Sequence, residues 1–116
     1  KYMNDGCLFC KISSAEISAD RLYEDDKVIA FRDINPQAPF HALVIPREHI
    51  ATVNDLTTDN SDLLAHMILT SKVIVSEHDL SEPGYRLIMN CNEQGGQTVY
   101  HIHLHILGGR QLRGLG

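Results

Sequence analysis

The chain has 116 residues, of which 43% are hydrophobic and 22% are charged, and its formal net charge at pH 7 is −5. This length suits a single domain over residues 1–116, and an acidic chain without a basic stripe is not expected to bind a nucleic-acid polymer. No apolar run approaches the roughly 20 residues that span a bilayer, and residues 1–6 lack the apolar segment of a secretory signal. We therefore expect a cytoplasmic protein with no membrane partner.

The hydrophobic pattern predicts an α+β fold with an antiparallel sheet of about five strands. In chain order, the predicted elements are a short helix or turn (7–16), strands 20–25, 27–34 and 40–46, a long helix (59–79), and strands 85–90 and 100–107. Residues 35–39 form a loop, because two prolines this close cannot lie in a central strand. The long helix is expected to pack on one face of the sheet.

Three cysteines, Cys7, Cys10 and Cys91, occur in a chain for which no export signal is found. This odd count argues against a disulfide framework. Cys7 and Cys10 form a C-x-x-C pair, which is typical of a metal-binding or a redox-active site. We find no βαβ pattern of the kind that a thioredoxin-like redox pair requires, so metal binding is favoured over redox chemistry, with buried free thiols as the alternative.

Histidines and aliphatic residues alternate near the C-terminus, in the order His101, Ile102, His103, Leu104, His105 and Ile106. Alternate side chains of a strand share a face, so we expect three imidazoles on one face and three aliphatic side chains in the core. The imidazoles could bind one metal ion, or one could attack as a nucleophile while its neighbours bind the group attacked. The loop from Asn90 to Thr98 offers an amide, two glycines and a hydroxyl, which is typical of a phosphate-binding nest and favours the second chemistry.

The segment His101–Leu107 resembles the His-φ-His-φ-His-φ-φ signature of the histidine triad (HIT) superfamily. Residues 95–100 (GGQTVY), 33–39 (DINPQAP) and 41–46 (HALVIP) resemble the same superfamily. The Gly-Gly-Arg tail at 108–110 is similar to the histidine triad nucleotide-binding (HINT) branch and unlike the dinucleoside polyphosphate hydrolase branch. The resemblance implies a HIT-like fold, with a short N-terminal helix beside the sheet and the long helix, and a homodimer that joins two sheets.

The resemblance also implies an activity, that of a purine nucleoside phosphoramidase. Such an enzyme hydrolyses phosphoramidates and related esters or anhydrides of AMP-type or GMP-type nucleotides through a nucleotidyl-histidine intermediate, and no cofactor is required for catalysis. Alternatives are a dinucleoside polyphosphate hydrolase or nucleotidyl transferase of the same superfamily, and a nucleotide-binding regulatory or scaffold protein with vestigial hydrolysis. A hydrolase with zinc held by all three triad histidines is a further alternative.

The resemblance assigns roles to individual residues of the catalytic site. His103 is the nucleophile, His105 contacts the α-phosphate, and His41 orients and tunes the nucleophile. Thr98 stands where this branch usually has serine, and its hydroxyl keeps proton delivery to the leaving group possible. The expected nucleotide-binding residues are Phe9, Ile12, Phe31, Ile34 and Ile88 around the base, Asp33 at the ribose hydroxyls, and Asn90, Gly96, Gln97, Thr98, Val99, His103 and His105 near the phosphate and leaving group.

A structural zinc site is also implied, through the C-x-x-C pair, a histidine after the Ile-Pro element and the first triad histidine. In this sequence those positions are Cys7, Cys10, His49 and His101, which would give tetrahedral coordination. His101 would then be structural, and the other two triad histidines would carry the chemistry.

Overall fold

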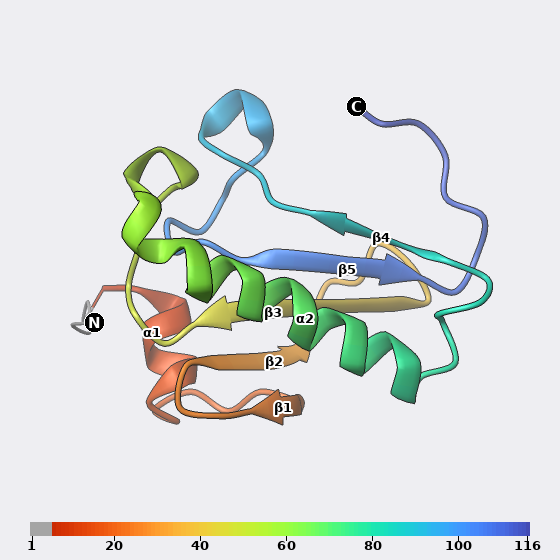
Figure 1. Cartoon of the computed structure of the whole chain (residues 1–116), viewed down its shortest axis with the longest axis horizontal. Helices are drawn as coiled ribbons and strands as arrows, with labels where there is room; N and C mark the ends of the chain where they lie inside the picture. The colour runs from red at the N-terminus through yellow and green to blue at the C-terminus, as the bar shows by residue number, and fades with distance from the viewer. Residues whose placement is uncertain (1–5) are drawn as a thin grey trace.

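The computed structural model describes residues 6–116, and its five strands form one antiparallel sheet in the order β1-β2-β3-β5-β4 (Figure 1). The strands are β1 (Arg21–Glu24), β2 (Val28–Arg32), β3 (Phe40–Pro46), β4 (Tyr85–Ile88) and β5 (Leu104–Gly108). The expected α+β fold is therefore confirmed. The strand predicted over 40–46 has these bounds in the structure, and the other four are two or three residues shorter than predicted. The expectation of no secretory signal concerns residues 1–6, of which residues 1–5 lie outside the described part.

Residues 6–116 also contain two helices and three single helical turns. The helices are α1 (Leu8–Ser13) and α2 (Ser61–Glu77), and the 3-10 turns are η1 (Val53–Asp55), η2 (Thr58–Asn60) and η3 (Glu93–Gly95). The helix predicted over 59–79 begins later because the Thr57 side chain caps η2, a tighter turn, just before α2. In the described residues, no helix combines the length and the apolar character that crossing a bilayer requires.

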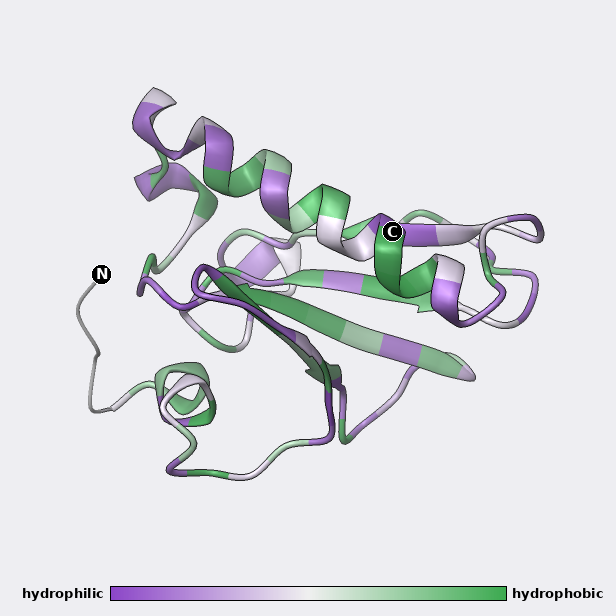
Figure 2. Ribbon diagram, turned by 60° about the horizontal axis from the view of Figure 1, so that its bottom comes forward, coloured by the Kyte–Doolittle hydropathy of each residue, from purple (hydrophilic) through white to green (hydrophobic). Residues whose placement is uncertain are grey.

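The sheet is covered on both faces, with α2 on one side and α1 on the other (Figure 2). The face under α2 has a core that includes Val28, Ala30, Ala42, Val44, Met67, Ile74, Ile102, Leu104 and Ile106. The face under α1 has a second core that includes Phe9, Cys10, Ile12, Ile29, Phe31, Leu43 and Ile45. Adjacent residues of β2 and β3 thus enter opposite cores, which explains why both strands are continuously apolar in sequence.

The triad strand begins later than predicted, at Leu104 instead of residue 100. Its pairing with β3 ends at Val44↔Leu104, and Pro46 has no N–H to extend the ladder. Instead, the backbone N–H of Ile102 donates to the carbonyl oxygen of Ile50 at 2.8 Å. The predicted alternation is nevertheless present in this segment. The aliphatic residues between and after the histidines enter the core under α2, while the rings of His101 and His103 contact Phe9 of α1.

Candidate active site and metal centre

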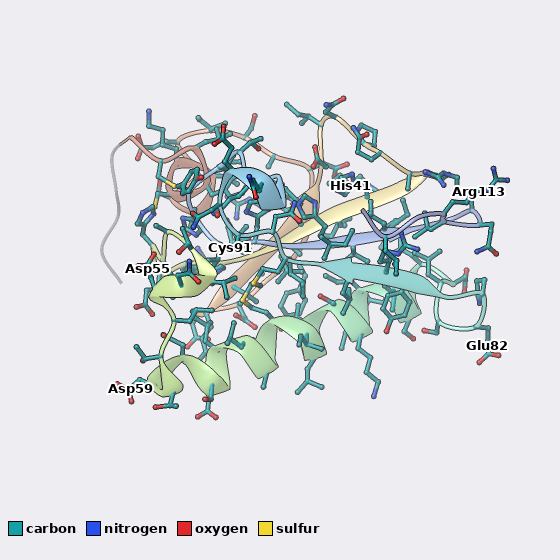
Figure 3. The ribbon with its side chains drawn as sticks, turned by 90° about the horizontal axis from the view of Figure 1, so that it is seen from above. His41, Asp55, Asp59, Glu82, Cys91 and Arg113 are labelled. Atoms are coloured by element: carbon teal, nitrogen blue, oxygen red, sulfur yellow. The ribbon has the colours of Figure 1, made fainter. Side chains whose placement is uncertain are left out.

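A pocket of about 530 Å³ lies beside the triad, on the α1 side of the sheet. Figure 3 shows His41 on the face of the sheet away from α2, where this pocket opens. Its apolar lining includes Phe9, Ile12, Phe31, Leu43 and Val99, and its polar lining includes Asp33, His41, Thr98, His103 and His105. An apolar wall with a few convergent polar groups is typical of a small-molecule site.

The hydrogen bond of His103 fixes which of its ring nitrogens carries the proton. Its Nδ1 lies 2.8 Å from the carbonyl oxygen of His101, and since a carbonyl only accepts, Nδ1–H is the donor. The neutral ring therefore has its lone pair on Nε2. Burial lowers the pKa of His103, although the hydrogen bond to the His101 carbonyl and the charge of Asp33 oppose this shift. A neutral imidazole with a free Nε2 can act as a nucleophile in the pocket.

His41 and His105 form a hydrogen-bonded pair in which each neutral ring carries its proton on Nε2, whereas His103 carries it on Nδ1. The backbone N–H of Gln37 donates to Nδ1 of His41 at 3.0 Å, so the proton of neutral His41 lies on Nε2. This Nε2–H donates to Nδ1 of His105 at 2.9 Å, which leaves the proton of neutral His105 on its own Nε2. The rings of His105 and His103 have centroids 4.9 Å apart. The pocket therefore has an N–H donor beside a nucleophilic lone pair.

The electrostatic environment keeps this pair of rings neutral. Burial lowers the pKa of His105 to about 4, and the neighbouring His103 and His41 add to the effect. Burial also lowers the pKa of His41, although Asp33 opposes this shift with a carboxylate oxygen 3.4 Å from His41 Nε2. A neutral imidazole has one donor and one acceptor nitrogen, so near pH 7 His41 and His105 keep the proton on Nε2 as described.

The glycine loop before the triad is braced by the buried side chain of Gln97. Its amide nitrogen donates to the carbonyl oxygens of Ala51 at 2.8 Å and Val99 at 3.1 Å, and its amide oxygen accepts from the backbone N–H of Asn92 at 2.9 Å. Gly96 has a φ of +87° in this loop, a conformation that glycine adopts without strain. The loop is thereby held against the pocket, which Gly96 lines.

Most of the predicted nucleotide-binding residues line the pocket, namely Phe9, Ile12, Phe31, Asp33, Ile34, Gly96, Thr98, Val99, His103 and His105. Ile34 is 97% exposed, which places it at the rim. Three others are not in the lining. Ile88 pairs with His105 across β4 and β5. The Asn90 amide nitrogen lies close to Gly96, 3.7 Å from where a Cβ atom on that glycine would be. The amide of Gln97 is engaged by backbone groups. The binding roles themselves stay predictions.

The sequence reasoning missed several residues of the pocket lining, and two parts of that lining concern the site directly. Residues 17–19, after α1, belong to its lining, and Gln37 contributes the backbone N–H that orients His41. Neither part carries a side-chain signal in the sequence. The close spacing of Pro36 and Pro39 is the only hint that the loop around Gln37 has a fixed shape.

The four predicted metal ligands come together at the N-terminal end of α1. Cys7, the N-cap residue of α1, and Cys10 meet His49 and His101, and one ligand atom from each lies within 4.8 Å of the others. Nδ1 of His101 is 3.3 Å from Cys7 Sγ and 3.5 Å from Cys10 Sγ. Nδ1 of His49 is 3.4 Å from Cys10 Sγ and 3.3 Å from Nδ1 of His101. This group is close enough to hold a metal ion.

The spacing of these atoms fits a tetrahedral zinc ion. Zn–S and Zn–N bonds of about 2.3 and 2.0 Å separate two nitrogens by about 3.3 Å, and a nitrogen from a sulfur by about 3.5 Å. His101 is also oriented for ligation, because its Nε2–H donates to the carbonyl oxygen of Pro46 at 2.7 Å and leaves Nδ1 as the free ligand atom.

Comparison with known proteins identifies the family of the chain. A sequence model of the HIT domain matches residues 14–112. The chain belongs to the HIT family. A curated HIT relative, the purine nucleoside phosphoramidase of Escherichia coli K12, is 51% identical over 110 residues, which cover 95% of this chain and 92% of that protein. The resemblance inferred from the triad is thus confirmed.

Solved structures of HIT proteins have the same fold. A HIT family hydrolase from Legionella pneumophila Philadelphia 1 superposes with a TM-score of 0.91 and 56% identity, over 92% of this chain and 96% of that chain. A histidine triad protein from Clostridium difficile has a TM-score of 0.96 and 39% identity, over 99% of this chain and all of that chain (100%).

Proposed function

We propose that the chain is a purine nucleoside phosphoramidase that cleaves the P–N bond of AMP-type or GMP-type phosphoramidates through a nucleotidyl group on His103. One observation carries this proposal: the free Nε2 lone pair of His103 lies beside the Nε2–H of His105 in one pocket. A nucleophile next to a hydrogen-bond donor is what displacement at an anionic phosphorus requires. The name of the 51% identical relative supports the same activity.

The first step is attack of His103 Nε2 on the α-phosphorus. A P–Nε2 bond forms as the P–N bond to the amine breaks, and the amine leaves with a proton that the hydroxyl of Thr98, a residue of the lining, can supply. The Nε2–H of His105 stabilises the charge that builds on a phosphoryl oxygen. In the second step, water attacks phosphorus and the P–Nε2 bond breaks. The proton that the water loses restores the Thr98 hydroxyl, and the nucleoside monophosphate is released.

The rest of the pocket suits a nucleoside. Asp33 uses Oδ1 to accept from the backbone N–H of Asn35 at 2.9 Å, and a carboxylate has further lone pairs for ribose hydroxyls. Phe9 and Phe31 meet edge to face, with ring centroids 5.7 Å apart, and form an apolar wall for the base. Apolar contacts discriminate weakly between purines, so both AMP-type and GMP-type substrates fit the proposal.

We include a structural zinc ion in the proposal, held by Cys7, Cys10, His49 and His101. Bound there, zinc would link the start of α1 to the segments before α2 and before β5, and it would take no part in the reaction. Phe9 follows two residues after Cys7 and contacts His103 at a centroid distance of 5.0 Å. The metal site therefore positions part of the base pocket through α1.

We also propose that the protein is a cytoplasmic homodimer. Ile68, Leu69 and Val73 of α2 are 52%, 57% and 48% exposed, and apolar side chains grouped on one helix suit a protein interface. β4 is an edge strand of the sheet and can pair with a second copy of itself. An odd count of three cysteines, two of them proposed as metal ligands, suits a protein of a reducing compartment.

The proposal is tested by turnover of an adenosine phosphoramidate by the parent protein and by two variants. The parent releases AMP and the amine, His103→Ala releases neither above background, and Cys91→Ser, which changes a cysteine outside the pocket lining, keeps parental turnover. Equal turnover by His103→Ala would exclude His103 as the nucleophile. An inactive parent that still binds AMP would favour a nucleotide sensor.

A further inference from the structure

The Gly-Gly-Arg segment after β5 contacts the loop that orients His41. Nη2 of Arg110 donates to the carbonyl oxygen of Gln37 at 3.0 Å, across 73 residues of sequence. Gln37 lines the pocket, whereas Arg110 is absent from its lining and lies exposed on the surface. Arg110 therefore reaches the site only through the backbone of Gln37.

We propose that Arg110 is a positioning residue that fixes the protons of His41 and His105 on their Nε2 atoms by holding the backbone of Gln37 in place. The Gln37 N–H donates to His41 Nδ1, and His41 Nε2–H donates to His105 Nδ1. Each hydrogen bond of this series determines the next one. The effect of these hydrogen bonds on catalysis rests on the proposed function, but their effect on the histidine tautomers does not.

The loop around Gln37 depends on such a contact because burial does little to hold it. Residues 34–37 are exposed, and the other side-chain bonds of the loop are local: Asn35 N–H donates to Asp33, and the Gln37 amide donates to the Asn35 carbonyl at 3.1 Å. Arg110 adds a bond from a distant part of the chain. A charged donor makes a stronger hydrogen bond than a neutral one.

Gly109 brings the arginine within reach of this loop. A Cβ atom on Gly109 would lie 2.9 Å from Cβ of Pro39 and 3.4 Å from the backbone nitrogen of Phe40, and its φ is +97°. Only glycine permits so close an approach with this backbone conformation. The chain after β5 is therefore seated against the end of the Gln37 loop, independently of the arginine bond itself.

Loss of the hydrogen bond from the Gln37 N–H to His41 would change which nitrogen of His105 carries the proton. With no donor at Nδ1, neutral His41 can carry its proton there and present a lone pair at Nε2. His105 must then donate from Nδ1, and its Nε2 becomes a lone pair that faces the phosphoryl oxygens. Such a ring repels the developing negative charge instead of stabilising it.

The test combines NMR of the imidazole nitrogens of the full chain near neutral pH, without substrate, with steady-state kinetics. In the parent, His41 and His105 give the pattern of a ring protonated on Nε2. In Arg110→Ala both show a mixture of the two tautomers, while His103, whose proton is fixed by the His101 carbonyl, is unchanged. Arg110→Lys, which keeps a charged donor, largely restores the parental pattern. Arg113→Ala, which removes a nearby exposed charge, leaves it intact.

The kinetics should follow the tautomers. For Arg110→Ala we expect kcat to fall roughly three- to tenfold, the effect of one exposed hydrogen bond, while KM changes little because Arg110 does not line the pocket. Parental tautomers of His41 and His105 in Arg110→Ala would overturn the inference, and so would an equal change in Arg113→Ala. The two proposals can also fail separately. If Arg110→Ala alters the tautomers but the parent protein hydrolyses no phosphoramidate, the positioning role is upheld and the proposed function is rejected.

Discussion

Protonation of His105 gives a quantitative test of the buried, neutral histidine pair. Burial is the main cause that lowers its pKa from 6.5 to about 4 in the folded protein, whereas the unfolded chain should titrate at about 6.5. Between these two values the unfolded state binds the proton more readily than the folded state. The stability associated with neutral His105 is therefore complete above about pH 6.5 and is lost as the pH falls toward about 4.

The size of this effect follows from the shift. One pKa unit corresponds to about 1.4 kcal/mol, so the whole shift amounts to at most about 3 kcal/mol. The linkage relation gives a loss of about 2 kcal/mol between pH 8 and pH 5. Protonation of the proposed metal ligands adds its own pH dependence, which must be removed by comparison with a variant.

His105→Asn is that variant, since the amide oxygen of asparagine can replace Nδ1 as the acceptor for His41 but does not titrate. Urea unfolding of both proteins at about pH 8 and about pH 5 should show that the parent loses about 2 kcal/mol more than the variant. Equal losses in the two proteins would refute the buried, neutral state of His105.

Two further predictions concern the loop and the metal. Gln97→Ala removes the amide that braces the glycine loop, so it should lower the free energy of unfolding by about 1–3 kcal/mol and raise KM. Gln94→Ala, at an exposed position, should do neither. Equal melting temperatures of the two variants would contradict the bracing role. A strong chelator should remove one zinc per chain from the parent and from Cys91→Ser and lower the melting temperature of both. It should not lower the melting temperature of Cys10→Ala. An unchanged melting temperature of the parent would refute the zinc site.

Much of the site could be predicted from residue type and spacing alone. The alternation of His101, His103 and His105 with aliphatic residues places the rings on one side of the backbone, and this holds although β5 begins only at Leu104. Cys7 and Cys10 are only three positions apart, so one turn of helix suffices to bring the two thiols together. Such features depend on local geometry, which a single sequence encodes directly.

Other features depend on backbone groups that every residue shares. No side-chain pattern indicates that the Gln37 N–H meets His41, or that the His101 carbonyl meets His103. Yet these two bonds decide which ring presents an N–H and which presents a lone pair to the pocket. The late start of β5 likewise depends on Pro46, a residue of the neighbouring strand. Long-range pairing of this kind requires the fold to be known.

The stereochemical course at phosphorus is the measurement that most directly tests covalent catalysis by His103. A phosphoramidate made chiral at phosphorus by sulfur substitution is hydrolysed in isotopically labelled water, and the configuration of the product is determined. Two successive in-line displacements, first by His103 and then by water, predict net retention. Net inversion would mean that water attacks the substrate directly, and would contradict a nucleotidyl-histidine intermediate.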